Sequence, residues 1–124
     1  MANSVLIVED EPNIILSLEF LMKKAGYDVA VERDGDAALA AMARSVPDLV
    51  LLDVMLPKRN GYQVCESIRN DPDLAGIKVI MLTAKGRDVE RDKGIALGAD
   101  AYITKPFSTR EVVDRVRQLL DGDG

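Results

Sequence analysis

The sequence predicts an α/β protein, a doubly wound five-stranded parallel sheet with strand order 2-1-3-4-5. Two patterns support this fold class: short apolar runs of strand length alternate five times with longer stretches of helical apolar spacing, and the connections between them are short, as in β–α units with helices on both faces of the sheet. The length of 124 residues fits one domain with a core of its own.

Five runs rich in Val, Ile and Leu are the predicted strands. Strands buried on both faces have continuous apolar sequence, which is the pattern seen here. Right-handed crossovers leave few topologies, and the flavodoxin-like order is the common one at this length. The predicted strands are residues 4–9, 28–32, 49–52, 79–82 and 101–103.

The stretches between these runs have the end signals of helices. Pro12 suits a first helical turn, and Gly26 follows the stripe that ends near Lys24. Asp34 or Asp36 is expected to cap the second helix. The remaining helices are expected after the loop with Asn60 and Gly61, over 86–97 with a stop at Gly98, and after a cap at Ser108 or Thr109. We expect one domain over 1–120 and a flexible tail or linker over 121–124.

Composition excludes several classes of function. The net charge is −5 without runs of Lys or Arg, so we expect no direct nucleic-acid binding by this domain. The absence of His excludes His-based acid–base catalysis and His-ligated zinc, and the single Cys65 is expected in the core. No stretch approaches the ~20 apolar residues of a membrane helix. The N-terminus lacks the pattern of a signal peptide, so we expect a cytoplasmic location and no membrane partner.

Polar residues follow four of the predicted strands at their carboxyl ends. Ligands of doubly wound sheets bind beyond these ends, where the strand order reverses, here between the first and third strands. The residues placed at that edge are Glu9, Asp10 and Glu11 after the first strand, Asp53 after the third, Thr83 after the fourth and Lys105 after the fifth.

The carboxylates of this edge require a counter-charge. Two negative charges about 4 Å apart repel by roughly 4 kcal/mol at an effective dielectric constant near 20. Oxygen ligands favour a hard cation, so the cluster predicts a magnesium site that also accepts phosphate. Asp53 is the strongest candidate because four large apolar residues precede it, whereas Glu11 beside Pro12 is more simply a loop residue. A cis bond between Lys105 and Pro106 could direct the Lys head inward.

Taken together, these motifs resemble the receiver domain of bacterial two-component response regulators of the CheY-like type. The resemblance covers essentially the whole chain, and the motifs are specific in this order and spacing. The matching segments are Leu6–Pro12, Pro47–Pro57, Leu82–Ala84 and Gly98–Phe107.

The resemblance implies a role for each site residue. Asp53 would accept the phosphoryl group, while Asp10 would bind Mg²⁺ directly and Glu9 through water, with Asp53 and the main-chain carbonyl of Met55 as further ligands. Thr83 and Lys105 would contact phosphoryl oxygens. The resemblance also implies that Tyr102 changes rotamer together with Thr83, and that Met55 and Lys85 flank the attack path and tune the lifetime of the phosphorylated state.

The same resemblance implies partners and an output. The phosphoryl donor would be a phosphohistidine on a sensor histidine kinase or a histidine phosphotransfer protein. The domain would catalyse only its own phosphorylation and dephosphorylation. A surface formed by the fourth helix, the fifth strand and the last helix would change on phosphorylation and bind a partner or a second copy of the domain.

Three other readings of the sequence stay open at this point. A magnesium-dependent aspartyl-phosphate phosphatase usually carries a second Asp two residues after its nucleophile, where this chain has Met55. A flavodoxin needs a Ser, Thr and Gly-rich phosphate loop after the first strand, where this chain has Glu9, Asp10 and Glu11. The third is an interaction module on the same scaffold that works without phosphorylation, against which the set of Asp53, Thr83 and Lys105 argues.

Overall fold

The computed structural model describes residues 3–84 and 98–121. Five strands form one sheet in the order β2-β1-β3-β4-β5, and every neighbouring pair is parallel. This arrangement confirms the predicted fold class and strand order. The strands are β1 Ser4–Val8, β2 Asp28–Glu32, β3 Leu49–Asp53, β4 Lys78–Ala84 and β5 Ala101–Lys105.

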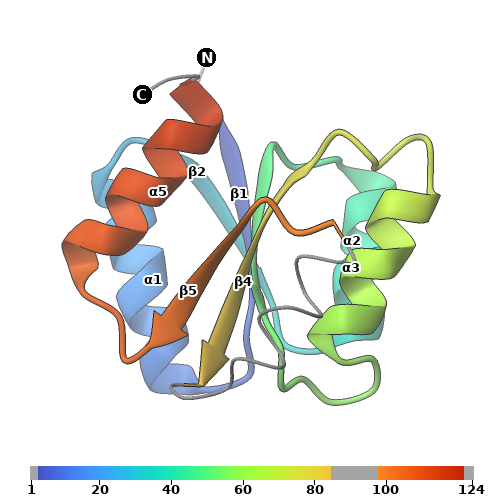
Figure 1. Ribbon diagram of the computed structural model, residues 1–124, viewed down its shortest axis with the longest axis horizontal. Coiled ribbons are helices and arrows are strands. Elements are labelled where there is room, and N and C mark those ends of the chain that lie inside the picture. The colour runs from blue at the N-terminus through green and yellow to red at the C-terminus, as the bar shows by residue number, and fades with distance from the viewer. Residues whose placement is uncertain (1–2, 85–97, 122–124) are drawn as a thin grey trace.

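Helices cover both faces of the sheet. Figure 1 shows α1 and α5 on one side of the sheet and α2 and α3 on the other. The described helices are α1 Pro12–Lys24, α2 Gly35–Arg44, α3 Gly61–Asn70 and α5 Thr109–Asp121. The predicted helix over 86–97 and Lys85 lie outside the described residues, and so do residues 122–124 of the predicted tail.

The carboxyl ends of four strands differ from the sequence prediction. β1 ends at Val8, so Glu9 lies just beyond it, whereas β3 continues to Asp53, β4 to Ala84 and β5 to Lys105. The extension of β5 follows from pairing, because Thr104 and Lys105 stand in register with Thr83 and Ala84 of β4. Backbone pairing therefore carries Lys105 inside the sheet, although its own side chain has no strand preference.

The core consists of two apolar layers on opposite faces of the sheet. Alternate residues of a strand point to opposite faces, so Leu6 and Val50 belong to the layer under α2 and α3, while Ile7 and Leu51 belong to the layer under α1 and α5. Cys65 is fully buried in the first layer, as predicted. Among the described residues, no helix has the length and apolarity needed to span a membrane.

Side-chain caps fix where the helices begin. Asp34, one of the two predicted caps, accepts a hydrogen bond from the Ala37 N–H at 2.7 Å. Ser108 caps α5 by accepting from the Glu111 N–H at 3.0 Å, and Thr109 is the first helical residue. At α3, Asn60 and Gln63 form a reciprocal capping box that the sequence prediction missed.

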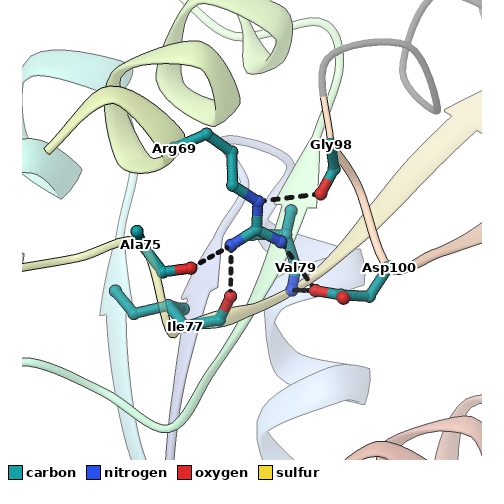
Figure 2. A network of polar contacts seen from close by, with 6 residues as sticks. All are labelled: Arg69, Ala75, Ile77, Val79, Gly98 and Asp100. Carbon is teal, nitrogen blue, oxygen red and sulfur yellow. Dashed lines mark hydrogen bonds and ion pairs between the residues drawn. The ribbon is translucent and has the colours of Figure 1, made fainter. Parts of the chain in front are cut away.

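Arg69 joins three separate parts of the chain at the amino ends of β4 and β5. Its guanidinium donates to the carbonyl oxygens of Gly98 at 2.8 Å, Ala75 at 2.9 Å and Ile77 at 2.6 Å (Figure 2). It also pairs with the Asp100 carboxylate at 2.7 Å, which in turn accepts from the Val79 N–H at 2.8 Å. This network, the Arg69 network, ties α3 to the turn that precedes β5.

Candidate functional site

Three polar side chains are buried together with the strand ends. Glu9 is 0% exposed, Thr83 3% and Asp53 4%, and these are the buried polar or charged residues among those the structure describes. Each lies at or next to the carboxyl end of a strand, directly after buried apolar residues. Burial of polar groups is unfavourable unless they find partners, so this edge of the sheet is the first place to look for chemistry.

Lys105 lies between the two buried carboxylates. Its Nζ atom is 2.9 Å from Glu9 Oε2 and 3.2 Å from Asp53 Oδ1. The three residues come from the ends of β1, β3 and β5, so the contacts depend on how the strands lie beside one another. One ammonium group therefore offsets part of the charge of two buried acids.

Glu9 uses both of its carboxylate oxygens within the protein. Oε2 accepts from Lys105, while Oε1 accepts from the N–H groups of Asp10 and Glu11, each at 3.2 Å. Glu9 thereby fixes the turn between β1 and α1, and it holds the backbone of its neighbour Asp10 at the edge of the site. Asp10 itself is exposed.

The loop after β3 closes tightly around Asp53. The Met55 N–H donates to Asp53 Oδ1 at 3.3 Å, and the Gly61 N–H donates to the Val54 carbonyl at 2.9 Å. A Cβ atom at Gly61 would overlap the Asp53 carbonyl oxygen and lie 2.8 Å from Val54 Cα. Glycine is therefore required where α3 begins, and the sequence prediction assigned Gly61 only to a loop, because no local pattern shows this close approach.

The electrostatics of the site are unbalanced toward negative charge. Burial and the nearby Glu9 carboxylate raise the pKa of Asp53 to about 7, although Lys105 acts in the opposite direction. Burial alone would lower the pKa of Lys105, but its hydrogen bond to Glu9 and the charges of Asp53 and Glu9 outweigh burial and raise it. Lys105 thus stays charged, and a further cation is needed to keep Asp53 ionised below neutral pH.

Glu9, Asp10 and Asp53 have the donor set of a hard-cation site. One carboxylate oxygen of each lies within 4.8 Å of the others. All of these donors are oxygen atoms, which magnesium prefers. Burial and the Glu9 carboxylate raise the pKa of Asp53, and a bound cation would oppose both effects. The residues present therefore fit a magnesium ion.

Comparison with known families agrees with this geometry. The profile of the response regulator receiver domain matches residues 5–117. The chain belongs to the response regulator receiver domain family. The resemblance stated from the sequence motifs is confirmed for the family.

Solved receiver domains superpose on nearly the whole chain. A response regulator described as putative, from Chloroflexus aurantiacus J-10-fl, is 34% identical with a TM-score of 0.94 and covers 98% of this chain and 99% of its own. The signal receiver domain of a Syntrophus aciditrophicus histidine kinase is 34% identical with a TM-score of 0.91, and the match covers 98% of this chain and 92% of its own. The Vibrio cholerae chemotaxis response regulator CheY4 is 26% identical with a TM-score of 0.91, and the match covers 97% of this chain and 100% of its own.

The other residues predicted for this receiver domain differ in how deeply they are buried. Thr83 is buried near the end of β4, and Tyr102 on β5 is partly buried against the layer under α2 and α3. Met55 is 63% exposed at the mouth of the site. The predicted cis bond between Lys105 and Pro106 is present. Lys85 lies outside the described residues.

Proposed function

We propose that this receiver domain takes a phosphoryl group onto Asp53 from a phosphohistidine donor, with Mg²⁺ bound beside it. The observation that carries the proposal is a buried carboxylate that contacts a lysine and stands within reach of two further acids. Such a group is unfavourable without a cation, and it is an oxygen nucleophile once it is ionised. Membership of the receiver family supports the same function.

The chemistry requires one bond to form and one to break. An Asp53 carboxylate oxygen attacks phosphorus while the bond from phosphorus to the donor nitrogen breaks. The donor ring, which carries a proton on its other nitrogen, takes the electron pair of that bond and leaves as neutral imidazole, and an acyl phosphate remains on Asp53. The transferring group carries negative charge on its oxygens, so catalysis is mainly positioning and electrostatic stabilisation. We assign the stabilising contacts to the Lys105 ammonium and the Thr83 hydroxyl. Water then hydrolyses the acyl phosphate at the same site.

We assign the metal to Asp10, Asp53 and the main-chain carbonyl of Met55, with Glu9 acting through water. Both Glu9 oxygens already accept hydrogen bonds within the protein, which supports an indirect role. When bound, the ion would supply positive charge to the carboxylates and to the phosphoryl oxygens.

The output that we propose is a shift between two conformations. Thr83 would move toward the phosphoryl group and Tyr102 would turn with it, which would change the surface formed by β5, α5 and the helix that the sequence predicts over 86–97. A partner, or a second copy of the chain, would bind there. Met55 and Lys85 would set how long the phosphoryl group survives. A sensor histidine kinase or histidine phosphotransfer protein in the cytoplasm remains the predicted donor.

Substitution of Asp53 tests the proposal directly. Asp53→Asn should fold but accept no phosphoryl group from acetyl phosphate and Mg²⁺, because the amide is not a nucleophile of this kind. Phosphorylation adds about 80 Da, the mass of one HPO₃ unit. Intact-mass measurement should find this addition on the unchanged chain and not on Asp53→Asn. The control is Asp73→Asn, which removes the same charge from an exposed linker position.

Each result decides between functions. Equal phosphorylation of Asp53→Asn would remove Asp53 as the acceptor. Absence of phosphorylation in the unchanged chain, with Mg²⁺ bound or not, would favour an interaction module that works without phosphate. Steady turnover of a phosphate ester would favour the phosphatase.

A further inference from the structure

The loop of residues 54–60, here the β3–α3 loop, carries the Met55 carbonyl that we assign to the metal. Its base is held by the Gly61 N–H on the Val54 carbonyl at 2.9 Å. Its outer part contains Lys58 at a φ of 70°, a left-handed conformation that residues other than glycine rarely adopt. Such a conformation persists only where surrounding contacts impose it, so the outer part of the loop needs a support.

That support is the amino end of α2. The Gly35 N–H donates to the Pro57 carbonyl at 3.3 Å, and Gly35 itself is buried. A Cβ atom at Gly35 would overlap the Arg59 carbonyl oxygen and lie 2.6 Å from Arg59 Cβ. Because the overlapping atom belongs to the backbone, no rotation of a side chain can relieve the clash.

An ion pair spans the same contact but adds less to it. Arg59 Nε is 2.7 Å from Asp36 Oδ1, with the two side chains 52% and 55% exposed. Exposed pairs of this kind contribute little, because solvent screens them and both side chains must be immobilised. The close approach of Gly35 to the loop backbone is therefore the main element of the support.

We propose that Gly35 is a positioning residue for the metal site: the amino end of α2 holds the β3–α3 loop where the Met55 carbonyl and the Asp53 carboxylate can bind Mg²⁺ together. The proposal rests on the function proposed above. Gly35 touches neither metal nor phosphate and acts through the backbone of Pro57 and Arg59. Any side chain at this position displaces the loop, and the metal site with it.

Two glycine substitutions separate this positioning role from the general effect of adding a methyl group to the backbone. Gly35→Ala adds one methyl group against the loop, whereas Gly76→Ala adds the same group where no atom lies within 4 Å. Gly35 is the first residue of α2 and has no positive φ, so alanine there would otherwise favour the helix. An effect of Gly35→Ala on the metal site would therefore come from the loop contact.

The expected result is a loss of metal affinity. In ¹H–¹⁵N NMR spectra recorded without metal, Gly35→Ala should shift the amide signals of residues 55, 56 and 58–60, and Gly76→Ala should not. Titration with Mg²⁺ should give a Kd about tenfold higher for Gly35→Ala, the range found for residues that orient metal ligands. Phosphorylation by acetyl phosphate should be slower at low Mg²⁺ and largely recovered at saturating Mg²⁺. Urea unfolding without metal should confirm that both variants are folded.

A second set of variants covers the case in which Gly35→Ala does not fold. Asp36→Ala and Arg59→Ala each change one exposed charge, and their effects on Mg²⁺ affinity through charge alone should add. If the ion pair between Asp36 and Arg59 helps to position the loop, the Kd for Mg²⁺ of the double variant should differ by about twofold from the value that additivity predicts. The difference is small because the pair is exposed and weak. The matched pair is Glu19 with Lys23 on α1, in which Lys23 is exposed and Glu19 is partly exposed, and its double variant should be additive.

The outcomes distinguish this inference from the proposed function. An unchanged chain that binds no Mg²⁺ and takes no phosphate overturns the proposed function. A chain that does both, but whose Gly35→Ala variant binds Mg²⁺ as Gly76→Ala does, overturns the positioning role alone. Additivity of Asp36→Ala and Arg59→Ala would count only against a part for the ion pair in the support, because the pair is exposed and contributes little.

Discussion

At the scale of single residues, the two buried acids of the site face one lysine among the described residues. Lys105 contacts Glu9 at 2.9 Å and Asp53 at 3.2 Å, and both acids are almost completely buried. Removing one partner of a buried ion pair leaves an uncompensated charge, which costs far more than the pair itself contributes. Lys105 therefore has a structural role in the protein without metal, in addition to the contact with phosphate that we propose.

Substitution of Lys105 should show this dependence on charge. Lys105→Met keeps most of the length of the side chain and removes its charge, so we expect the free energy of unfolding without metal to fall by about 3 kcal/mol at pH 8. The loss should be smaller at pH 5, because Asp53, whose pKa is raised to about 7, is then mostly protonated. Urea unfolding at the two pH values measures it.

Lys78→Met is the control for that substitution. Lys78 is exposed at the start of β4, so its replacement should change stability little and equally at both pH values. Equal losses for Lys105→Met at pH 5 and pH 8 would contradict the electrostatic explanation.

At the scale of elements, the Arg69 network connects α3 to the amino ends of β4 and β5, at the end of the sheet opposite the site. One guanidinium donates hydrogen bonds to three carbonyl oxygens and one carboxylate, which without it would need water or other donors (Figure 2). Gly98, with a φ of 100°, lies so close that an added Cβ would stand 2.9 Å from Arg69 Cγ. The planar fork of arginine suits this arrangement, and a single ammonium group does not.

Arg69→Lys should therefore destabilise the protein although it keeps the charge. Lysine can reach only some of the acceptors, so we expect a loss of about 1–3 kcal/mol, discounted for the partial exposure of the pair. Arg44→Lys on the exposed end of α2 is the control and should change stability by less than about 0.5 kcal/mol. Equal urea midpoints for the two variants would show that the network contributes nothing measurable.

At the scale of the whole molecule, the site reduces the stability of the fold that carries it. Burial and Glu9 raise the pKa of Asp53 from 3.8 to about 7. Between these values the folded chain holds a proton that the unfolded chain has lost, so stability falls as pH rises from about 4 to about 7 and then levels off. A shift of this size corresponds to a loss of about 4 kcal/mol.

The stability of Asp53→Asn relative to the unchanged chain should follow this pH dependence. Without metal, the variant should be more stable at pH 8, and the difference should shrink toward pH 4, where Asp53 is neutral. Saturating Mg²⁺ at pH 8 should stabilise the unchanged chain more than the variant, because a ligand of the folded state adds stability by mass action. Thermal unfolding across pH, with and without Mg²⁺, measures both effects. A difference that is constant with pH would mean that the pKa of Asp53 is close to its ordinary value.

The order and type of the described elements followed from the sequence alone, because apolar runs and helical spacing are local patterns. The placement of Glu9, Asp53, Thr83 and Lys105 at one edge followed as well, since the carboxyl ends of parallel strands share an edge. The capping box of Asn60 and Gln63 was within reach, because its spacing is a known signature of helix starts.

Only the tertiary structure decided which of these groups touch. The contact of Lys105 with Glu9 joins residues 96 positions apart and depends on strand register and side-chain reach. The need for glycine at 35 and 61 comes from backbones that approach from elsewhere in the chain, and the partners of Arg69 include Asp100, which is 31 positions away. Such contacts leave no local pattern, because they are set by packing between elements rather than by the preferences of the residues themselves.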